Sequence, residues 1–108
     1  MTTPKETLGE FEHQVLLTAL RIGPEAYSVP IVLELEERTG REVAPAAVYI
    51  ALRRLEEKRL VVSEMRRDEE EGGRSRRYFR VTDDGTRVLR EAKRRFVNLW
   101  EGLDPQLG

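Results

Sequence analysis

Apolar residues recur at helical spacing in four segments of this chain, and residues that favour helix ends separate these segments. The first predicted helix covers residues 8–22, and the second covers residues 29–39. The third begins near Pro45, which suits a first helical turn because that position has no hydrogen bond to lose. The last runs from residue 83 toward residue 101. The pattern therefore predicts a mainly α fold.

Between the third and the last predicted helix, the pattern changes to two short runs that are typical of strands. Residues 60–65 and residues 77–81 are rich in β-branched, apolar and aromatic side chains. An acidic run at residues 68–71 and the pair Gly72-Gly73 lie between them, and such segments favour turns. We therefore expect a small β-hairpin with a long tip.

The last predicted helix has an apolar stripe with alternating steps of three and four residues, the spacing of a coiled-coil seam. The stripe consists of Leu89, Ala92, Phe96, Leu99 and Leu103. A stripe of this kind is buried against a second helix, so we expect residues 83–103 to form a long C-terminal dimerisation helix. Residues 8–82 then form the main domain. Residues 1–7 are predicted to be a flexible N-terminus and residues 104–108 a tail.

Composition narrows the classes of function. The chain has 108 residues, 36% of them charged, and no cysteine, so disulfides and thiolate metal sites are excluded. With a single histidine, it offers no nucleophile–base pair, phosphate loop or metal-ligand spacing, so we expect no enzyme, no metal and no cofactor. It has neither a signal peptide nor an apolar run that spans a bilayer. We expect a cytoplasmic protein without membrane contact.

Two arginines on the third predicted helix indicate a nucleic-acid partner, although the net charge of the chain is −1. Arg53 and Arg54 lie opposite the inward residue Val48 on the helical wheel. A guanidinium group can reach a phosphate or bind a guanine edge with two hydrogen bonds. The alternative is a solvated face on which these arginines pair with Glu56 and Glu57.

The hairpin adds four more arginines, Arg74, Arg76, Arg77 and Arg80, with no acidic residue among them. Side chains alternate along a strand, so Arg76 and Arg77 lie on opposite faces and the four cannot contact DNA equally. We predict phosphate contacts from Arg74 and Arg76; the alternative is a solubilising hairpin. A helix with an arginine-bearing outer face beside a basic hairpin predicts a winged helix-turn-helix domain that binds double-stranded DNA.

Three segments resemble the PadR family of transcriptional regulators. Residues 48–61 resemble the recognition helix of that family and its continuation, and residues 73–85 resemble its wing. Residues 8–12 and 26–28 are similar to its first helix and the turn that follows. The resemblance extends over about residues 8–103. A chain that ends soon after one terminal helix is similar to the short members of the family.

The resemblance implies a homodimeric repressor that binds a pseudo-palindromic operator, with Tyr49 both packing and contacting DNA. It places dimer contacts on the first and last helices. The expected contacts are Leu8, Phe11, Val15, Leu89, Phe96, Leu99, Trp100 and Leu103. Some members respond to small aromatic ligands, which implies an effector site at Trp100 with Phe96 and Phe11; simple dimer packing is the alternative for Trp100. An alternative function is a winged-helix protein-interaction module without specific DNA binding.

The chain departs from the family pattern at two places. Arg59 stands where the family usually has a glycine, so a non-glycine residue must end the recognition helix, with some backbone strain. Ala44, Ala46 and Ala47 replace the usual small polar residues at the start of that helix. These alanines cannot donate hydrogen bonds from their side chains, so they are not predicted as polar DNA contacts.

Overall fold

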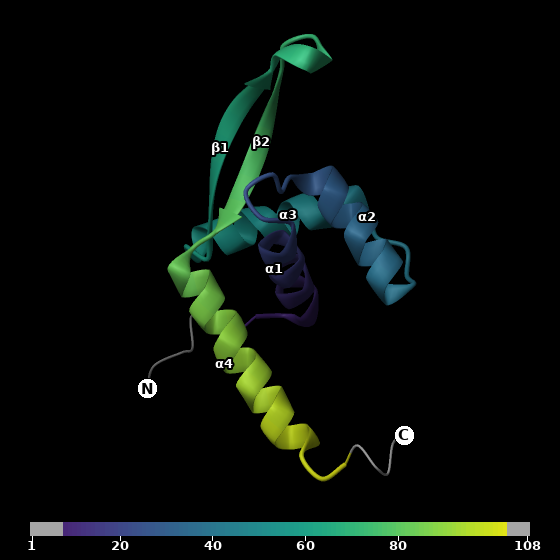
Figure 1. Cartoon of the computed structure of the whole chain (residues 1–108), viewed down its shortest axis with the longest axis vertical. Coiled ribbons are helices and arrows are strands. Elements are labelled where there is room, and N and C mark those ends of the chain that lie inside the picture. The colour runs from purple at the N-terminus through teal and green to yellow at the C-terminus, as the bar shows by residue number, and fades with distance from the viewer. Residues whose placement is uncertain (1–7, 104–108) are drawn as a thin grey trace.

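The computed structural model describes residues 8–103, which form four helices and one antiparallel hairpin (Figure 1). The elements are α1 (Glu10–Ile22), α2 (Ser28–Thr39), α3 (Pro45–Glu57), β1 (Val61–Asp68), the 3-10 turn η1 (Glu69–Glu71), β2 (Arg74–Val81) and α4 (Asp83–Trp100). The mainly α fold with a small hairpin is confirmed. The predicted flexible N-terminus and tail lie outside the described residues.

The core lies where α1, α2 and α3 meet the root of the hairpin. Val15 and Leu16 of α1, Leu52 and Leu55 of α3, and Phe79 of β2 are almost completely buried there. These three elements thus turn apolar side chains inward, and each buried side chain of this size stabilises the fold by about 1.5–3 kcal/mol. The hairpin and the far end of α4 extend from this body in opposite directions (Figure 1).

Local signals at the helix ends were mostly identified correctly from the sequence. Gly40 ends α2 in the left-handed region at φ 71°, and Thr82 caps α4 by accepting a hydrogen bond from the Gly85 N–H at 3.0 Å. Ser28 does not cap α2, although serine before residues 29–39 favours that role. Ser28 is the first helical residue, and the preceding Tyr27 occupies the cap position without a side-chain hydrogen bond.

The hairpin is longer than predicted. β1 pairs with β2 from Val61 opposite Val81 to Asp68 opposite Arg74. The acidic run does not interrupt the ladder, because Asp68 accepts a hydrogen bond from the Glu70 N–H at 3.0 Å and so caps the turn η1. The charged tip is therefore a tight turn on two full-length strands.

The end of α3 and the start of α4 meet at Arg59 and Leu60. Arg59 has φ 62°, which confirms the predicted left-handed ending without glycine. The Leu60 N–H donates to the Leu55 carbonyl at 2.9 Å, and the Thr82 hydroxyl donates to the Arg59 carbonyl, also at 2.9 Å. A Cβ added to the buried Gly85 would lie 2.3 Å from the Leu60 carbonyl oxygen. Contact this close requires glycine at the start of α4.

Candidate nucleic-acid interface

The outer face of α3 is exposed along its whole length. Opposite the buried stripe it presents Ala46, Ile50, Arg53 and Glu57 to solvent, and Ile50 is 51% exposed. Alanine and isoleucine side chains have no hydrogen-bonding groups, so they can contact a thymine methyl group but cannot read a polar base edge. Polar contacts from this face must come from its arginines.

One flank of α3 faces the start of α1. The Lys58 ammonium lies 2.7 Å from the Glu12 carboxylate, and Glu12 also accepts from the Gly9 N–H at the start of α1. Arg54 and Ile50 line a hollow of about 600 Å³ together with the first residues of α1. Arg54 is therefore on the α1 side of α3, not on the side of the hairpin.

The other flank of α3 faces the hairpin. The Tyr49 ring meets the Phe79 ring edge-on at 6.4 Å between centroids, and 41% of Tyr49 remains exposed. Tyr49 thus packs at its ring while part of its surface faces solvent. This position allows both parts of the role that the family resemblance implies.

A chain of polar contacts links the hairpin to α3. The Arg77 guanidinium donates to the Ser63 hydroxyl at 2.9 Å, and that hydroxyl donates to the Glu56 carboxylate. On its other side, Glu56 lies 3.4 Å from the Arg53 guanidinium. The structure therefore connects Arg53 on α3 to Arg77 on the hairpin through Glu56 and Ser63.

Arg77 was not among the predicted DNA contacts. The alternation of side chains along the strand could have pointed to it. Arg77 shares a face with Phe79, and Phe79 is buried in the core beside α3. That face therefore points toward the recognition helix at the root of the hairpin. Arg76 is on the opposite face, with its guanidinium 4.3 Å from the centre of the Tyr27 ring and 3.8 Å from the Asp68 carboxylate. Arg74 is exposed at the tip end of β2.

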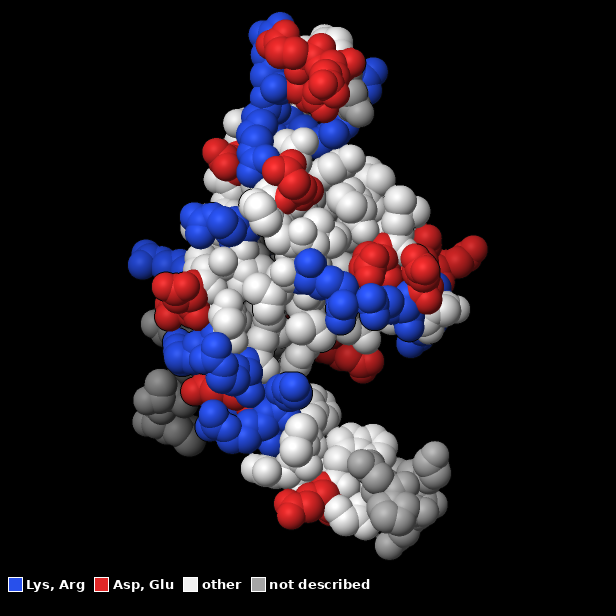
Figure 2. Space-filling model, viewed as in Figure 1, with Lys and Arg blue, Asp and Glu red and all other residues white. Residues whose placement is uncertain are grey.

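Positive charge is distributed unevenly over the molecule. In the view of Figure 2, Lys and Arg side chains gather over α4 and along the hairpin, whereas Asp and Glu cluster at the hairpin tip and over α2. The protein therefore has local basic surfaces although its net charge is −1. The acidic tip is turned away from the body at the far end of the hairpin (Figure 1).

The predicted dimer contacts divide into two groups. Val15 and Leu89 are buried in the core of the single chain, and Leu8 and Phe11 are partly buried against it. The remaining four are exposed, and they are Phe96, Leu99, Trp100 and Leu103 at 57%, 72%, 46% and 42%. Only this second group offers a large apolar surface to another subunit.

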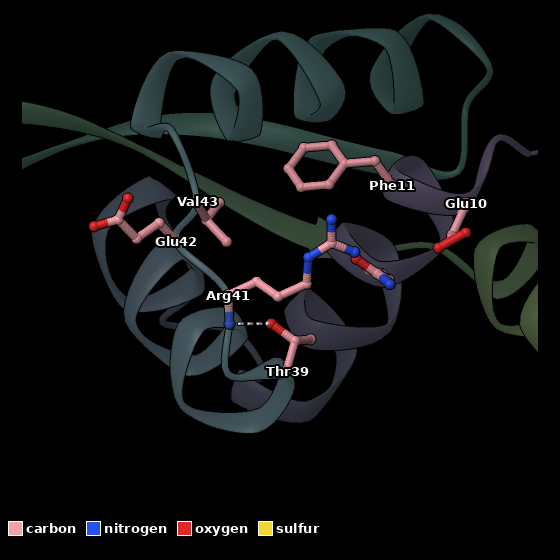
Figure 3. Close-up of a pocket in the computed structure, with 7 residues that line it drawn as sticks. Glu10, Phe11, Thr39, Arg41, Glu42 and Val43 are labelled. Carbon is pink, nitrogen blue, oxygen red and sulfur yellow. Dashed lines mark hydrogen bonds between the residues drawn. The ribbon is translucent and has the colours of Figure 1, made fainter.

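The three predicted ligand contacts lie in two separate places within one chain. Phe11 lines a hollow of about 300 Å³ between α1 and the α2–α3 link, into which Arg41 reaches (Figure 3). Phe96 and Trp100 line a different, shallow hollow of about 400 Å³ near the end of α4. Convergence of all three would require residues from two chains.

His13, the histidine of α1, is half-buried and lies near Arg95 of α4. Burial and the nearby Arg95 guanidinium lower the pKa of His13 below its usual 6.5, so the neutral imidazole is favoured. Within residues 8–103, no group of three His, Asp or Glu side chains is arranged to hold a metal ion. No helix in this part of the chain is long and apolar enough to cross a membrane.

Three helices, a hairpin that packs beside the third, and a long final helix define a winged helix-turn-helix protein. Residues 16–91 match the transcriptional regulator PadR-like family. A PadR family transcriptional regulator from Eggerthella lenta DSM 2243 is 34% identical, with a TM-score of 0.67 over 86% of this chain and 80% of that chain. The chain therefore belongs to the PadR-like family of transcriptional regulators.

Other solved structures share the fold. A PadR family transcription regulator from hypervirulent Clostridium difficile R20291 is 24% identical, with a TM-score of 0.71 over 89% of this chain and 98% of that chain. A putative transcriptional regulator from Thermoplasma acidophilum is 22% identical, with a TM-score of 0.71 over 90% of each chain. No curated protein matched the sequence.

Proposed function

We propose that this protein binds double-stranded DNA as a homodimer and represses transcription at a pseudo-palindromic operator. In this proposal α3 enters the major groove and the hairpin lies against the flanking backbone. The observation that carries the proposal is the chain of contacts that connects Arg53 on α3, through Glu56 and Ser63, to Arg77 on the hairpin. Two elements of the fold thereby present cations beside one exposed helix face.

The contacts that we propose follow from the positions of the side chains. Arg53 and Arg77 bind phosphates between α3 and the wing, and Arg54 binds the backbone on the α1 side. Arg74 contacts DNA from the exposed end of β2, and Tyr49 contributes its exposed edge. The outer face of α3 has no other polar group suited to an acidic ligand, so phosphate contacts supply most of the affinity.

The proposed dimer uses the apolar end of α4. Five large apolar side chains are exposed at the end of α4 and just after it, and they are Phe96, Val97, Leu99, Trp100 and Leu103. Two copies that meet through this surface bring two α3 helices into a symmetric arrangement suited to a pseudo-palindrome. In the same dimer, Trp100 and Phe96 are placed to hold a small aromatic effector that relieves repression.

Mobility-shift titration with the chain's own promoter, at several salt concentrations, tests DNA binding. For the variant Arg53→Ala with Arg77→Gln, we expect the slope of log affinity against log salt to fall by about 0.9 per lost phosphate contact. A matched control is Arg90→Ala with Arg94→Ala, which removes the same charge from α4. Unchanged operator binding by the first variant would refute the proposed surface.

The alternative function, a protein-interaction module, makes a different prediction in the same titration. Such a module would bind operator and random duplex DNA equally weakly. A specific operator complex that depends on Arg53 and Arg77 excludes it.

The effector proposal has its own test. Planar aromatic compounds should quench the fluorescence of Trp100, the single tryptophan, and lower operator affinity. If such compounds change neither signal, those ligands are excluded.

A further inference from the structure

Four side chains on the hairpin and the α1–α2 link stack on one another, on the hairpin face opposite to Phe79. The Arg66 guanidinium lies 4.1 Å from the centre of the Tyr78 ring. The Tyr78 ring meets the Tyr27 ring edge-on at 5.4 Å, and the Arg76 guanidinium lies 4.3 Å from the centre of the Tyr27 ring. Both arginines are thus placed over the electron-rich faces of aromatic rings.

The register of the hairpin makes this arrangement unusual. Arg66 and Arg76 are directly opposite each other on β1 and β2. Like charges in opposed positions destabilise a hairpin unless something else offsets the repulsion. Each of the two rings lies against one of the two guanidinium groups. The rings therefore offset part of the repulsion between Arg66 and Arg76.

Acidic groups offset the repulsion further. The Arg66 guanidinium lies 3.3 Å from the carboxylates of both Glu25 and Glu64, and it donates to the Pro24 carbonyl at 2.9 Å. The Arg76 guanidinium lies 3.8 Å from the Asp68 carboxylate. Both cations are thus engaged by partners within the chain, and the side chains of Arg66 and Arg76 are 35% and 25% exposed, compared with 48% for Arg53.

The stack also joins two segments that are distant in sequence. Tyr27 belongs to the link between α1 and α2, where the Phe79 N–H donates to the Ala26 carbonyl at 2.8 Å. That hydrogen bond fixes the root of β2, and the stack extends the attachment outward to the pair Arg66–Arg76. An isolated two-stranded hairpin is only marginally stable in water, so its direction depends on attachments such as these.

We propose that Arg66, Tyr78, Tyr27 and Arg76 form a clamp that fixes the direction of the wing relative to α3. Arg66 and Arg76 are then positioning residues and do not bind phosphate. The effect of the clamp on operator affinity rests on the proposed DNA-binding function. Its effect on the wing itself does not, and can be measured without DNA.

Amide hydrogen exchange of the free protein tests the clamp directly. In Tyr27→Leu, we expect amides of the outer hairpin, residues 64–67 and 75–78, to exchange about tenfold faster than in the wild type. Tyr27→Phe, which keeps the ring, should exchange like the wild type. Core amides at residues 88–92 of α4 serve as an internal control for the fold. Wild-type exchange in the hairpin of Tyr27→Leu would overturn the clamp.

A double-mutant cycle on operator affinity separates positioning from phosphate contact. With a clamp, Tyr27→Leu and Arg76→Gln each weaken binding about tenfold, and the double variant binds no more weakly than the weaker single variant. With a phosphate contact, Tyr27→Leu binds normally and Arg76→Lys restores the affinity lost in Arg76→Gln. The second result would overturn the positioning role.

Failure of the two proposals can be told apart. If the wild type binds no operator while Tyr27→Leu frees the hairpin amides, the DNA-binding proposal fails and the clamp stands. If the wild type binds its operator and Tyr27→Leu changes neither exchange nor affinity, the clamp fails and the DNA-binding proposal stands.

Discussion

The two halves of α4 have the same apolar spacing but opposite surroundings. In the first half, Val88, Leu89 and Ala92 are buried against the core, with at most 7% of any of them exposed. In the second half, Phe96 and Leu99 continue the stripe but are 57% and 72% exposed. A periodic stripe therefore indicates that a helix has an apolar face, but it does not indicate what covers that face.

The difference has a physical cause in where α4 begins. Thr82 and Gly85 attach the start of the helix to Arg59 and Leu60, at the end of α3. The first turns of α4 therefore lie beside α1 and the core. Because a helix is straight and the core is small, the later turns extend beyond the body (Figure 1). We therefore expect the stability of the fold and the proposed dimer to depend on different residues of α4.

A matched pair of leucine substitutions gives the largest expected difference between the halves. Leu89→Ala should lower the free energy of unfolding by about 3 kcal/mol, because it leaves a cavity in the core. Leu99→Ala should change it by less than about 0.5 kcal/mol at low protein concentration, and should weaken only the proposed dimer. Urea unfolding at two protein concentrations measures both effects. Equal losses at low concentration would contradict the division of α4.

Gly85→Ala tests the attachment of the first half. Alanine favours helices, yet its Cβ would lie 2.3 Å from the Leu60 carbonyl oxygen and 2.7 Å from the Val81 Cγ1. We expect a loss of about 2 kcal/mol in the free energy of unfolding, measured by urea titration. Arg90→Ala on the exposed side of α4 is the control and should stay within about 0.5 kcal/mol of the wild type. A Gly85→Ala protein as stable as this control would show that the atoms around Gly85 can shift at little cost in free energy.

Arg59→Gly should strengthen the same attachment from the α3 side. Arg59 has φ 62°, a conformation that costs a non-glycine residue about 1 kcal/mol. We therefore expect Arg59→Gly to raise the free energy of unfolding by about 1 kcal/mol and the melting temperature by about 4–8 °C. Arg59→Ala keeps the Cβ atom, so it should gain little. If Arg59→Gly and Arg59→Ala raise the free energy of unfolding equally, the gain comes from removing the Arg59 side chain beyond its Cβ atom. Relief of backbone strain would then not explain it.

The titration of His13 tests the boundary between the two halves of α4. His13 lies near Arg95, and Arg95 stands in the sequence between the buried Ala92 and the exposed Phe96. The pKa of His13 is lower in the folded state than the ordinary 6.5, so below that pH the unfolded chain binds more protons. Stability should therefore fall as the pH drops through 6.5 toward the lowered pKa. Urea unfolding of the wild type and His13→Gln at about pH 7.5 and about pH 5.5 measures this. The same pH dependence in both proteins would contradict the assignment.

Much of the fold could be predicted from local patterns. The inward stripe of α3, the left-handed Gly40 and the Thr82 cap depend on residues within a few positions of one another. The hairpin was predicted too short, because an acidic run usually marks a loop. Here Asp68 caps the turn with its own carboxylate, so the strands continue to the tip.

The candidate site was harder to predict, because it depends on which strand face meets which helix. Alternation separates Arg76 from Arg77, but the choice between them required knowing that Phe79 is buried beside α3 and that Tyr27 covers the other face. Arg66 and Tyr78 meet across the hairpin, but Tyr27, which contacts both Arg76 and Tyr78, comes from the distant link between α1 and α2. No local spacing encodes such a contact.

The sequence alone determined the elements, their order and the family resemblance, since these depend on periodicity, helix caps and motifs within short windows. Only the tertiary structure decided that Arg77 is connected to Arg53 through Ser63 and Glu56, and that Arg76 stacks on Tyr27. It alone also decided that the stripe of α4 passes from core to exposed surface between Ala92 and Phe96. The reason is that burial and charge pairing are set by neighbours from distant segments, which assemble only when the chain packs.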